Sequence, residues 1–232
     1  MSEHLVIFDL DGVLVDTGKV MKEAFSTAYA AVAGAGPPPF AEYRRYLGAP
    51  LDEIVRKMKL PPNMGPHFRE ASKRLAHLVR PYPRIISVLD LFKKHEYTLA
   101  LFTGKDFDRT RDLLQRLRME RFFDSIVTGD DVKKGKPDPE GLLQILERTN
   151  TEAQRALFVG DSTYDIVCAR RAEVPSIGVS WGLTKAGMLA RARPTFLIHC
   201  PQDLFPVVAA VLRPSSPHRR NSSSSDELRT NN

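Results

Sequence analysis

The stretch "FDLDGVLVDT", residues 8 to 17, decides the fold, because it joins an apolar strand to a pair of acids. Residues 5–8 are apolar and suit a buried strand. Asp9 and Asp11 follow directly, with Gly12 behind them. A buried carboxylate is costly unless something compensates its charge. Two acids at the end of a buried strand are therefore either turn or helix-cap residues or part of a functional site.

Downstream of residue 83, strand-like apolar runs alternate with amphipathic helical stripes. Strands are expected within residues 97–103, 122–130, 156–161 and 176–181, and helices at 85–92, 106–118, 139–149 and 163–172. A short helix and a strand near 195–198 extend the pattern. This alternation predicts the α/β class, with a doubly wound, Rossmann-like parallel sheet.

A helical section interrupts this pattern between the first strand and the rest. Residues 17–80 carry three apolar stripes of helical period, separated by the breaker "GAGPPPF". We therefore expect a core made of residues 1–16 and 81–212, with an inserted all-helical cap at 17–80. Residues 213–232 are polar and rich in serine, a composition that predicts a disordered tail.

Composition narrows the classes of partner. The 232 residues carry a net charge of +6, without a basic stripe that interleaves with aromatic residues, so we expect no nucleic-acid partner. No apolar run is long enough to cross a bilayer, and the first residues do not resemble a signal peptide. We expect a cytoplasmic protein without a membrane partner. Cys168 and Cys200 predict neither a disulfide framework nor a zinc site. Monomer and homodimer both stay open.

Chemically active side chains follow the predicted strands, where the strands end. They are Asp9 and Asp11, then Thr103 and Gly104, then Asp161 with Asp165 four residues later. The carboxyl ends of parallel strands share one edge of a sheet, which is where ligands bind. A cluster of carboxylates at that edge requires a cation. Oxygen ligands and a substrate phosphate favour Mg²⁺.

A basic group is expected to balance the phosphate. The segment "KKGKPDPE" supplies Lys133, Lys134 and Lys136. Asp138 and Pro139 are typical of an N-cap and the first residue of a helix. That helix start would hold Lys136 near the same edge of the sheet.

These four pieces, in this order, resemble the haloacid dehalogenase superfamily over about residues 4–200. "FDLDGVLVDT" and "GVSWG" are most similar to its phosphoglycolate phosphatase and β-phosphoglucomutase branch, and the helical insert resembles its type-one cap. The resemblance implies an aspartate nucleophile at Asp9 and an acid/base at Asp11. It implies that Thr103, the backbone of Gly104 and Lys136 bind the substrate phosphate.

The same resemblance implies a Mg²⁺ site. The metal would be held by the carboxylates of Asp9 and Asp161 and by the backbone carbonyl of Asp11. Asp165 would orient these ligands or bind the metal through water. The implied reaction is hydrolysis of a small phosphorylated metabolite, a sugar, amino-sugar or glycolate phosphate, through an aspartyl phosphate.

Two other functions stay open. A phosphomutase shares the same core and differs in how well the closed cap keeps water from the phosphorylated enzyme. A non-catalytic binding protein could retain the fold, although the complete motif set opposes it. Asp11 argues against a dehalogenase, which needs no acid at this position, and against phosphonatase chemistry.

Several positions depart from the family pattern or invite a second interpretation. Gly104 stands where Asn is frequent, and Glu173 stands where Gly is common. "FTGK" is similar to phosphatases associated with 3-amino-5-hydroxybenzoate synthesis, which would imply an amino-sugar phosphate such as kanosamine 6-phosphate. Trp181 and Cys168 are expected to be packing residues. The cap arginines are expected to be solvated; they are Arg44, Arg45 and Arg56.

Overall fold

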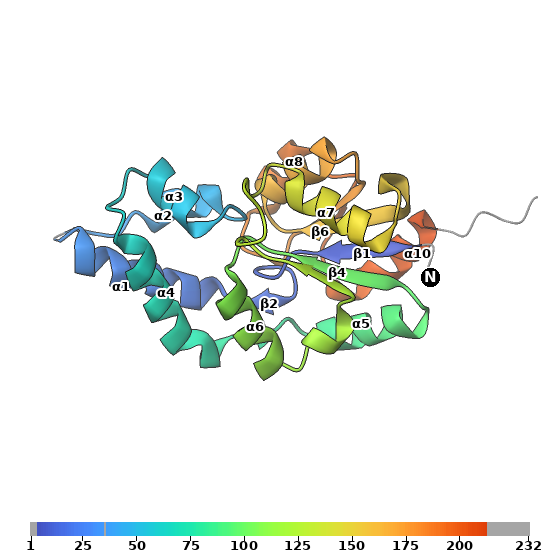
Figure 1. The fold of residues 1–232 in the computed structure, drawn as a ribbon, viewed down its shortest axis with the longest axis horizontal. Helices are drawn as coiled ribbons and strands as arrows, with labels where there is room; N and C mark the ends of the chain where they lie inside the picture. Colours follow the sequence, from blue (N-terminus) through green and yellow to red (C-terminus); the bar gives the residue numbers. More distant parts are fainter. Residues whose placement is uncertain (1–3, 35, 213–232) are drawn as a thin grey trace, which may run out of the picture.

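The computed structural model describes residues 4–34 and 36–212, and a six-stranded sheet lies at its centre (Figure 1). The strand order is β5-β4-β1-β6-β7-β8, and every pairing is parallel. The bounds are β1 (Leu5–Phe8), β4 (Thr98–Phe102), β5 (Ser125–Val127), β6 (Ala156–Gly160), β7 (Ser176–Val179) and β8 (Phe196–Ile198). The predicted α/β class with a parallel sheet is confirmed.

Strand β1 lies in the middle of the sheet because all of its side chains are apolar. Leu5 pairs with Thr98 of β4 on one side and with Ala156 of β6 on the other. All four residues of β1 are fully buried. A continuous apolar run of this kind is typical of a strand that is covered on both faces.

Helices cover the two faces of the sheet, as the alternating pattern predicts (Figure 1). Their bounds are α5 (Ile85–Lys94), α6 (Phe107–Arg116), α7 (Glu140–Thr149), α8 (Thr163–Arg171), α9 (Ala186–Ala192) and α10 (Leu204–Val211). Buried residues of α5, α6 and α10 pack with Val6 and Phe8 of β1. Those of α7 and α8 pack with Leu5 and Ile7 on the opposite face. The alternation of β1 side chains thus serves two hydrophobic clusters.

The inserted helical section has a hydrophobic cluster of its own. It contains α1 (Gly18–Val32), α2 (Phe40–Tyr43), α3 (Leu51–Lys57) and α4 (Met64–Leu75). Phe25, Tyr43 and Phe68 lie at its centre, with the rings of Phe25 and Tyr43 4.7 Å apart. The two connections to the sheet pair with each other as short antiparallel strands, β2 (Val15–Asp16) and β3 (Arg80–Pro81). The division into a core and a cap at 17–80 stays a prediction.

The boundaries differ from the predictions in a few places. The helix after Asp138 begins at Glu140, with Pro139 at the N-cap position rather than at the first helical position. Asp138 still accepts a hydrogen bond from the Glu140 N–H at 3.1 Å, so it caps the turn that leads into the helix. The predicted tail at 213–232 lies outside the described residues. Within 4–34 and 36–212, no helix is long and apolar enough to cross a bilayer.

Candidate active site

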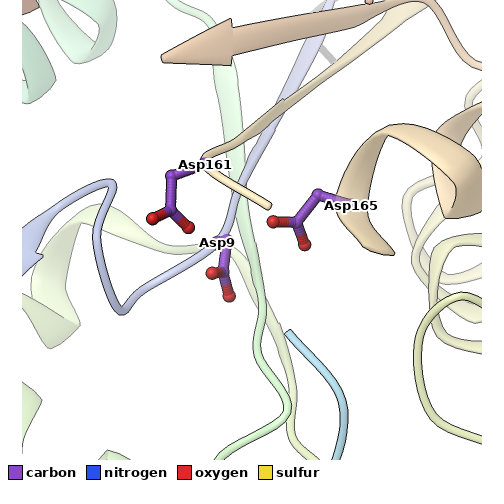
Figure 2. Close-up of side chains that lie close together, drawn as sticks. All are labelled: Asp9, Asp161 and Asp165. Carbon is purple, nitrogen blue, oxygen red and sulfur yellow. The ribbon is translucent and has the colours of Figure 1, made fainter. Parts of the chain in front are cut away.

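Three carboxylates meet at the carboxyl edge of the sheet (Figure 2). Asp9 follows β1, Asp161 follows β6, and Asp165 lies in the first turn of α8. One oxygen of each lies within 4.8 Å of the others, and all three residues are buried. The structure therefore brings together three of the four acids that the sequence places in the site.

Asp165 is held by a reciprocal cap at the start of α8. Its Oδ2 accepts hydrogen bonds from the Ser162 N–H at 3.0 Å and from the Ser162 hydroxyl at 2.6 Å, and its own N–H donates to Ser162 Oγ. Its Oδ1 accepts from Lys136 Nζ at 2.7 Å. Both oxygens are thus occupied, an arrangement that suits a residue that orients its neighbours.

Lys136 is fully buried and binds to the acids. Its ammonium group donates to Asp9 Oδ1 at 2.8 Å, to Asp165 Oδ1 at 2.7 Å and to the Phe102 carbonyl at 3.1 Å. Burial disfavours the charged form, but Asp165 and Asp9 outweigh it and raise the pKa of Lys136. Since these contacts use all three ammonium protons, a bond from Lys136 to a substrate phosphate stays a prediction.

Asp9 and Asp161 each keep one oxygen available. Lys136 binds Asp9 Oδ1, and the Leu183 N–H donates to Asp161 Oδ2 at 2.6 Å. Among the described residues, nothing pairs with Asp9 Oδ2 or Asp161 Oδ1, and both acids line a cavity. Burial raises the pKa of Asp9 to about 7, and burial with the charges of Asp165 and Asp9 raises that of Asp161 well above its usual range.

The donor set fits a divalent cation. When ionised, the three carboxylates exceed the single ammonium of Lys136 by two negative charges. The free oxygens of Asp9 and Asp161 are hard ligands of the type that Mg²⁺ prefers. The pKa shifts point the same way, because they express the cost of holding these charges in a buried site without a counter-ion.

Two glycines make room for the Asp161 carboxylate. A Cβ at Gly12 would lie 2.2 Å from Asp161 Oδ2, and one at Gly182 would lie 2.4 Å from the same atom. Gly12 also has a φ of +84°, which disfavours any other residue. The glycine that the sequence places behind the two acids therefore has a steric role in the site.

Asp11 lies apart from the three buried carboxylates and pairs with Lys105. Its Oδ2 lies 3.1 Å from Lys105 Nζ, while its Oδ1 has no hydrogen-bond partner in the described part of the chain. Both residues line the cavity. Sequence reasoning missed Lys105, although its place two residues after Thr103, just beyond the end of β4, was an available signal.

Thr103 and Gly104 also line the cavity, and their binding to a substrate phosphate stays a prediction. Thr103 is buried, and its Oγ1 accepts a hydrogen bond from the Lys105 N–H at 3.2 Å. A Cβ at Gly104 would lie 2.7 Å from the carbonyl oxygen of Gly48, which belongs to the helical insert. The close approach of this backbone explains why glycine stands where the family often has Asn.

The helical insert covers the site. Tyr43, Gly48 and Phe68 line the cavity on its side. Arg44 donates a hydrogen bond to the Leu183 carbonyl, so this arginine contacts the core rather than solvent alone. Arg45 and Arg56 are exposed, as expected.

Two further residues have the packing roles expected of them. Trp181 packs against the apolar cluster on one face of the sheet and donates from Nε1 to the Val13 carbonyl at 3.1 Å. Cys168 is fully buried in the cluster on the other face. The backbone at Glu173 has a φ of +58°, a conformation that favours the glycine common in the family at this position. Nothing in the structure explains why a glutamate stands there.

An open parallel sheet with a buried acidic cluster at its carboxyl edge, beside a cavity that a helical insert also lines, places the candidate site where open α/β folds bind their ligands. The model of the haloacid dehalogenase-like hydrolase family matches residues 6–179. The chain belongs to this family, and the predicted enzyme is confirmed as one of its hydrolases.

Relatives agree with this assignment. A phosphoglycolate phosphatase of Agrobacterium fabrum is 35% identical, over 80% of this chain and 84% of that protein. A phosphorylated carbohydrates phosphatase of Thermotoga maritima is 33% identical, over 89% and 99%. The crystal structure of a putative β-phosphoglucomutase from Thermotoga maritima has a TM-score of 0.70 and 30% identity, over 90% and 100%.

Proposed function

We propose that the protein is a Mg²⁺-dependent phosphatase that hydrolyses a small phosphate ester through a covalent aspartyl phosphate. One observation carries the proposal. Asp9 is buried in a cluster that has two excess negative charges when ionised, and Asp9 lines a cavity and has one carboxylate oxygen without a partner among the described residues. A buried anionic nucleophile needs a cation before a phosphate dianion can approach it. The phosphatases among the relatives support this function.

Asp9, Asp161 and the Asp11 carbonyl would hold the metal, with Asp165 orienting them. When bound, Mg²⁺ would neutralise charge between the Asp9 carboxylate and the phosphoryl oxygens. The free Oδ1 of Asp161 suits this role, and Asp9 would bind the metal through Oδ1, beside its contact with Lys136. The second oxygen of Asp9, Oδ2, would then be left to attack the substrate.

The protein's own side chains would carry the two steps. In the first, Asp9 Oδ2 forms a bond to phosphorus while the ester oxygen leaves and takes a proton from Asp11. In the second, Asp11 takes a proton from water, which attacks phosphorus and releases Asp9 and inorganic phosphate. Lys105 would keep Asp11 in place through the contact at 3.1 Å. Thr103 and the Gly104 N–H would hold phosphoryl oxygens.

Several small phosphate esters are candidate substrates. The relatives act, by their names, on phosphoglycolate and on phosphorylated carbohydrates. Amino-sugar phosphates such as kanosamine 6-phosphate are candidates only because of the sequence resemblance of "FTGK". Cytoplasmic location and a monomeric or homodimeric state stay predictions from sequence.

A phosphate-release assay over glycolate, sugar and amino-sugar phosphates, with and without Mg²⁺, tests the proposal. We expect release that requires Mg²⁺ and is absent in Asp9→Asn. Isomerised hexose phosphate without free phosphate would indicate a phosphomutase instead. Binding without any turnover would indicate a non-catalytic protein.

A further inference from the structure

A second group of polar side chains lines the cavity, separate from the acidic cluster. Arg109 lies on α6, and Tyr43 and Ser72 lie on the helical insert. Resting on the proposed phosphatase function, we infer that the substrate carries a second anionic group, a carboxylate or a phosphate, bound by Arg109 and the Tyr43 hydroxyl. The alcohol part of the ester would then be a short, acidic one.

Arg109 is partly buried, and the protein uses only part of its hydrogen-bonding capacity. Its side chain is 12% exposed, and its Nε donates to Asp106 Oδ2 at 2.7 Å. The ring of Phe68 lies 5.7 Å from its Cζ. Among the described residues, no acceptor pairs with the two terminal nitrogens of the guanidinium. Four N–H groups thus stay unpaired on a side chain that lines the cavity.

The interaction with Asp106 leaves the two terminal nitrogens of Arg109 available to a further anion. The Asp106 carboxylate accepts the Arg109 N–H at 3.0 Å as the N-cap of α6 and also lies 3.4 Å from Arg69 Nε. Arg69 is paired more closely with Asp52, at 2.6 Å, so the two guanidinium groups share two carboxylates. Burial raises the pKa of Asp106, but the charge and hydrogen bonds of Arg109, together with the charge of Lys105, outweigh burial and lower it, so Asp106 stays ionised and fixes the Arg109 side chain.

Tyr43 presents a hydrogen-bond donor in the same cavity. The residue is 3% exposed, and its hydroxyl has no partner in the part of the chain that the structure describes. Burial and the charge of Asp11 raise the pKa of Tyr43, so the hydroxyl keeps its proton. The hydroxyl opens to the cavity, where an acceptor on a ligand can take its hydrogen bond.

The acids that line the cavity form no ion pair with Arg109 within the described ranges. Asp11 is paired with Lys105 at 3.1 Å. Asp112, three residues along α6 from Arg109, is exposed. An exposed acid of this kind is screened by water and attracts weakly.

An anion fits these donors better than a neutral group does. A guanidinium matches a carboxylate or phosphate with two parallel hydrogen bonds, which are stronger than bonds to a neutral oxygen. A neutral alkyl group would offer the Arg109 and Tyr43 donors no acceptor. We therefore expect selectivity for substrates that carry a second charge.

Matched pairs of esters test this inference. Phosphoglycolate is compared with ethyl phosphate for the carboxylate, and propanediol bisphosphate with propanediol monophosphate for the phosphate. We expect kcat/KM to favour the charged member of at least one pair. In Arg109→Gln this preference should fall about 10–100-fold, the range for a lost charge-assisted hydrogen bond. The pair that responds identifies the anion.

Arg111→Gln is the matched control, because Arg111 lies on the same helix, is exposed and does not line the cavity. It should retain the preference of the wild-type protein. Tyr43→Phe removes only the hydroxyl and should lower the preference several-fold, which keeps the test informative if Arg109→Gln does not fold. Equal kcat/KM within both wild-type pairs, or an unchanged preference in both variants, would overturn the inference.

A binding measurement separates this inference from the proposed phosphatase function. Isothermal titration of Asp9→Asn with phosphoglycolate and with ethyl phosphate, both in Mg²⁺, reports recognition without turnover. Tighter binding of phosphoglycolate that is lost on addition of Arg109→Gln supports the inference even if the wild-type protein releases no phosphate. Hydrolysis of all four esters without such a difference would leave a phosphatase and remove the second anion site.

Discussion

Asp9 is the residue on which the proposed chemistry depends. Asp9→Asn preserves shape and can still accept from Lys136, but an amide is a poor nucleophile. We expect kcat for phosphate release to fall by about 10⁴-fold or more, since nothing replaces covalent catalysis. Circular dichroism should show an unchanged fold. Asp90→Asn is the control, because Asp90 is exposed and pairs with exposed Arg121. Turnover near the wild-type rate would remove Asp9 from this role.

The buried charge of Asp161 lowers the stability of the metal-free protein, and Asp161 is a proposed metal ligand. Asp161→Asn removes one of two excess negative charges while its side-chain oxygen can still accept from the Leu183 N–H. The metal-free protein should therefore melt higher, by about 2–4 °C for each kcal/mol gained. The Mg²⁺ concentration for half-maximal activity should rise at least about 100-fold. A lower melting temperature with unchanged Mg²⁺ dependence would contradict both expectations.

Sequence reasoning found the residues that end the strands and missed those that only tertiary contacts assemble. Asp9, Thr103 and Asp161 follow apolar runs, so their shared edge was predictable. The three bonds of Lys136 and the exposure of Arg109 to the cavity depend on how the helices pack. Periodicity carries no information about which side chain pairs with which across the fold.

At the scale of elements, the approach of the insert to Gly104 determines what the site tolerates. Gly104→Ala would place a Cβ 2.7 Å from the Gly48 carbonyl oxygen, so one backbone must move. We expect kcat/KM to fall about tenfold or more, because small displacements of catalytic geometry are costly. Gly187→Ala is the control, since its Cβ would meet nothing within 4 Å and it lies in α9. Equal activity of both variants would show that the insert does not dock there during turnover.

Most elements were predictable from periodicity, including the three-residue strand near 195–198, but two kinds of element were missed. The helices near 85, 106 and 163 begin within two residues of their predicted positions. The β2 and β3 pair has two residues in each strand, too few for any alternation to show. The helix Leu204–Val211 was missed because it is almost wholly apolar and gives no stripe.

At the scale of the whole molecule, stability and pH are linked through Asp9. Its pKa is about 7 in the folded protein against 3.8 for the ordinary carboxyl, so the folded state binds the proton more tightly. The free energy of unfolding of the metal-free protein should therefore fall as pH rises from about 4 to about 7, and level off above. The raised pKa of Asp161 also makes the free energy of unfolding fall as pH rises.

Melting temperatures of the metal-free wild-type protein and Asp9→Asn between pH 5 and 8 check this expectation. The advantage of the variant should grow with pH, and saturating Mg²⁺ should reverse it by stabilising only the wild-type site strongly. Parallel curves would contradict a raised Asp9 pKa.

Leu183 connects the helical insert to the acidic cluster. Its N–H donates to Asp161, and its carbonyl accepts from Arg44 of the insert. The two groups belong to the two peptide planes that meet at the Leu183 Cα, so a displacement of this residue affects both contacts. By thermodynamic linkage, if the contact of Arg44 with Leu183 changes the cation affinity of Asp161, then a cation bound to Asp161 changes the stability of the Arg44 contact by the same factor. Metal binding and contact of the insert with the core would then be thermodynamically coupled.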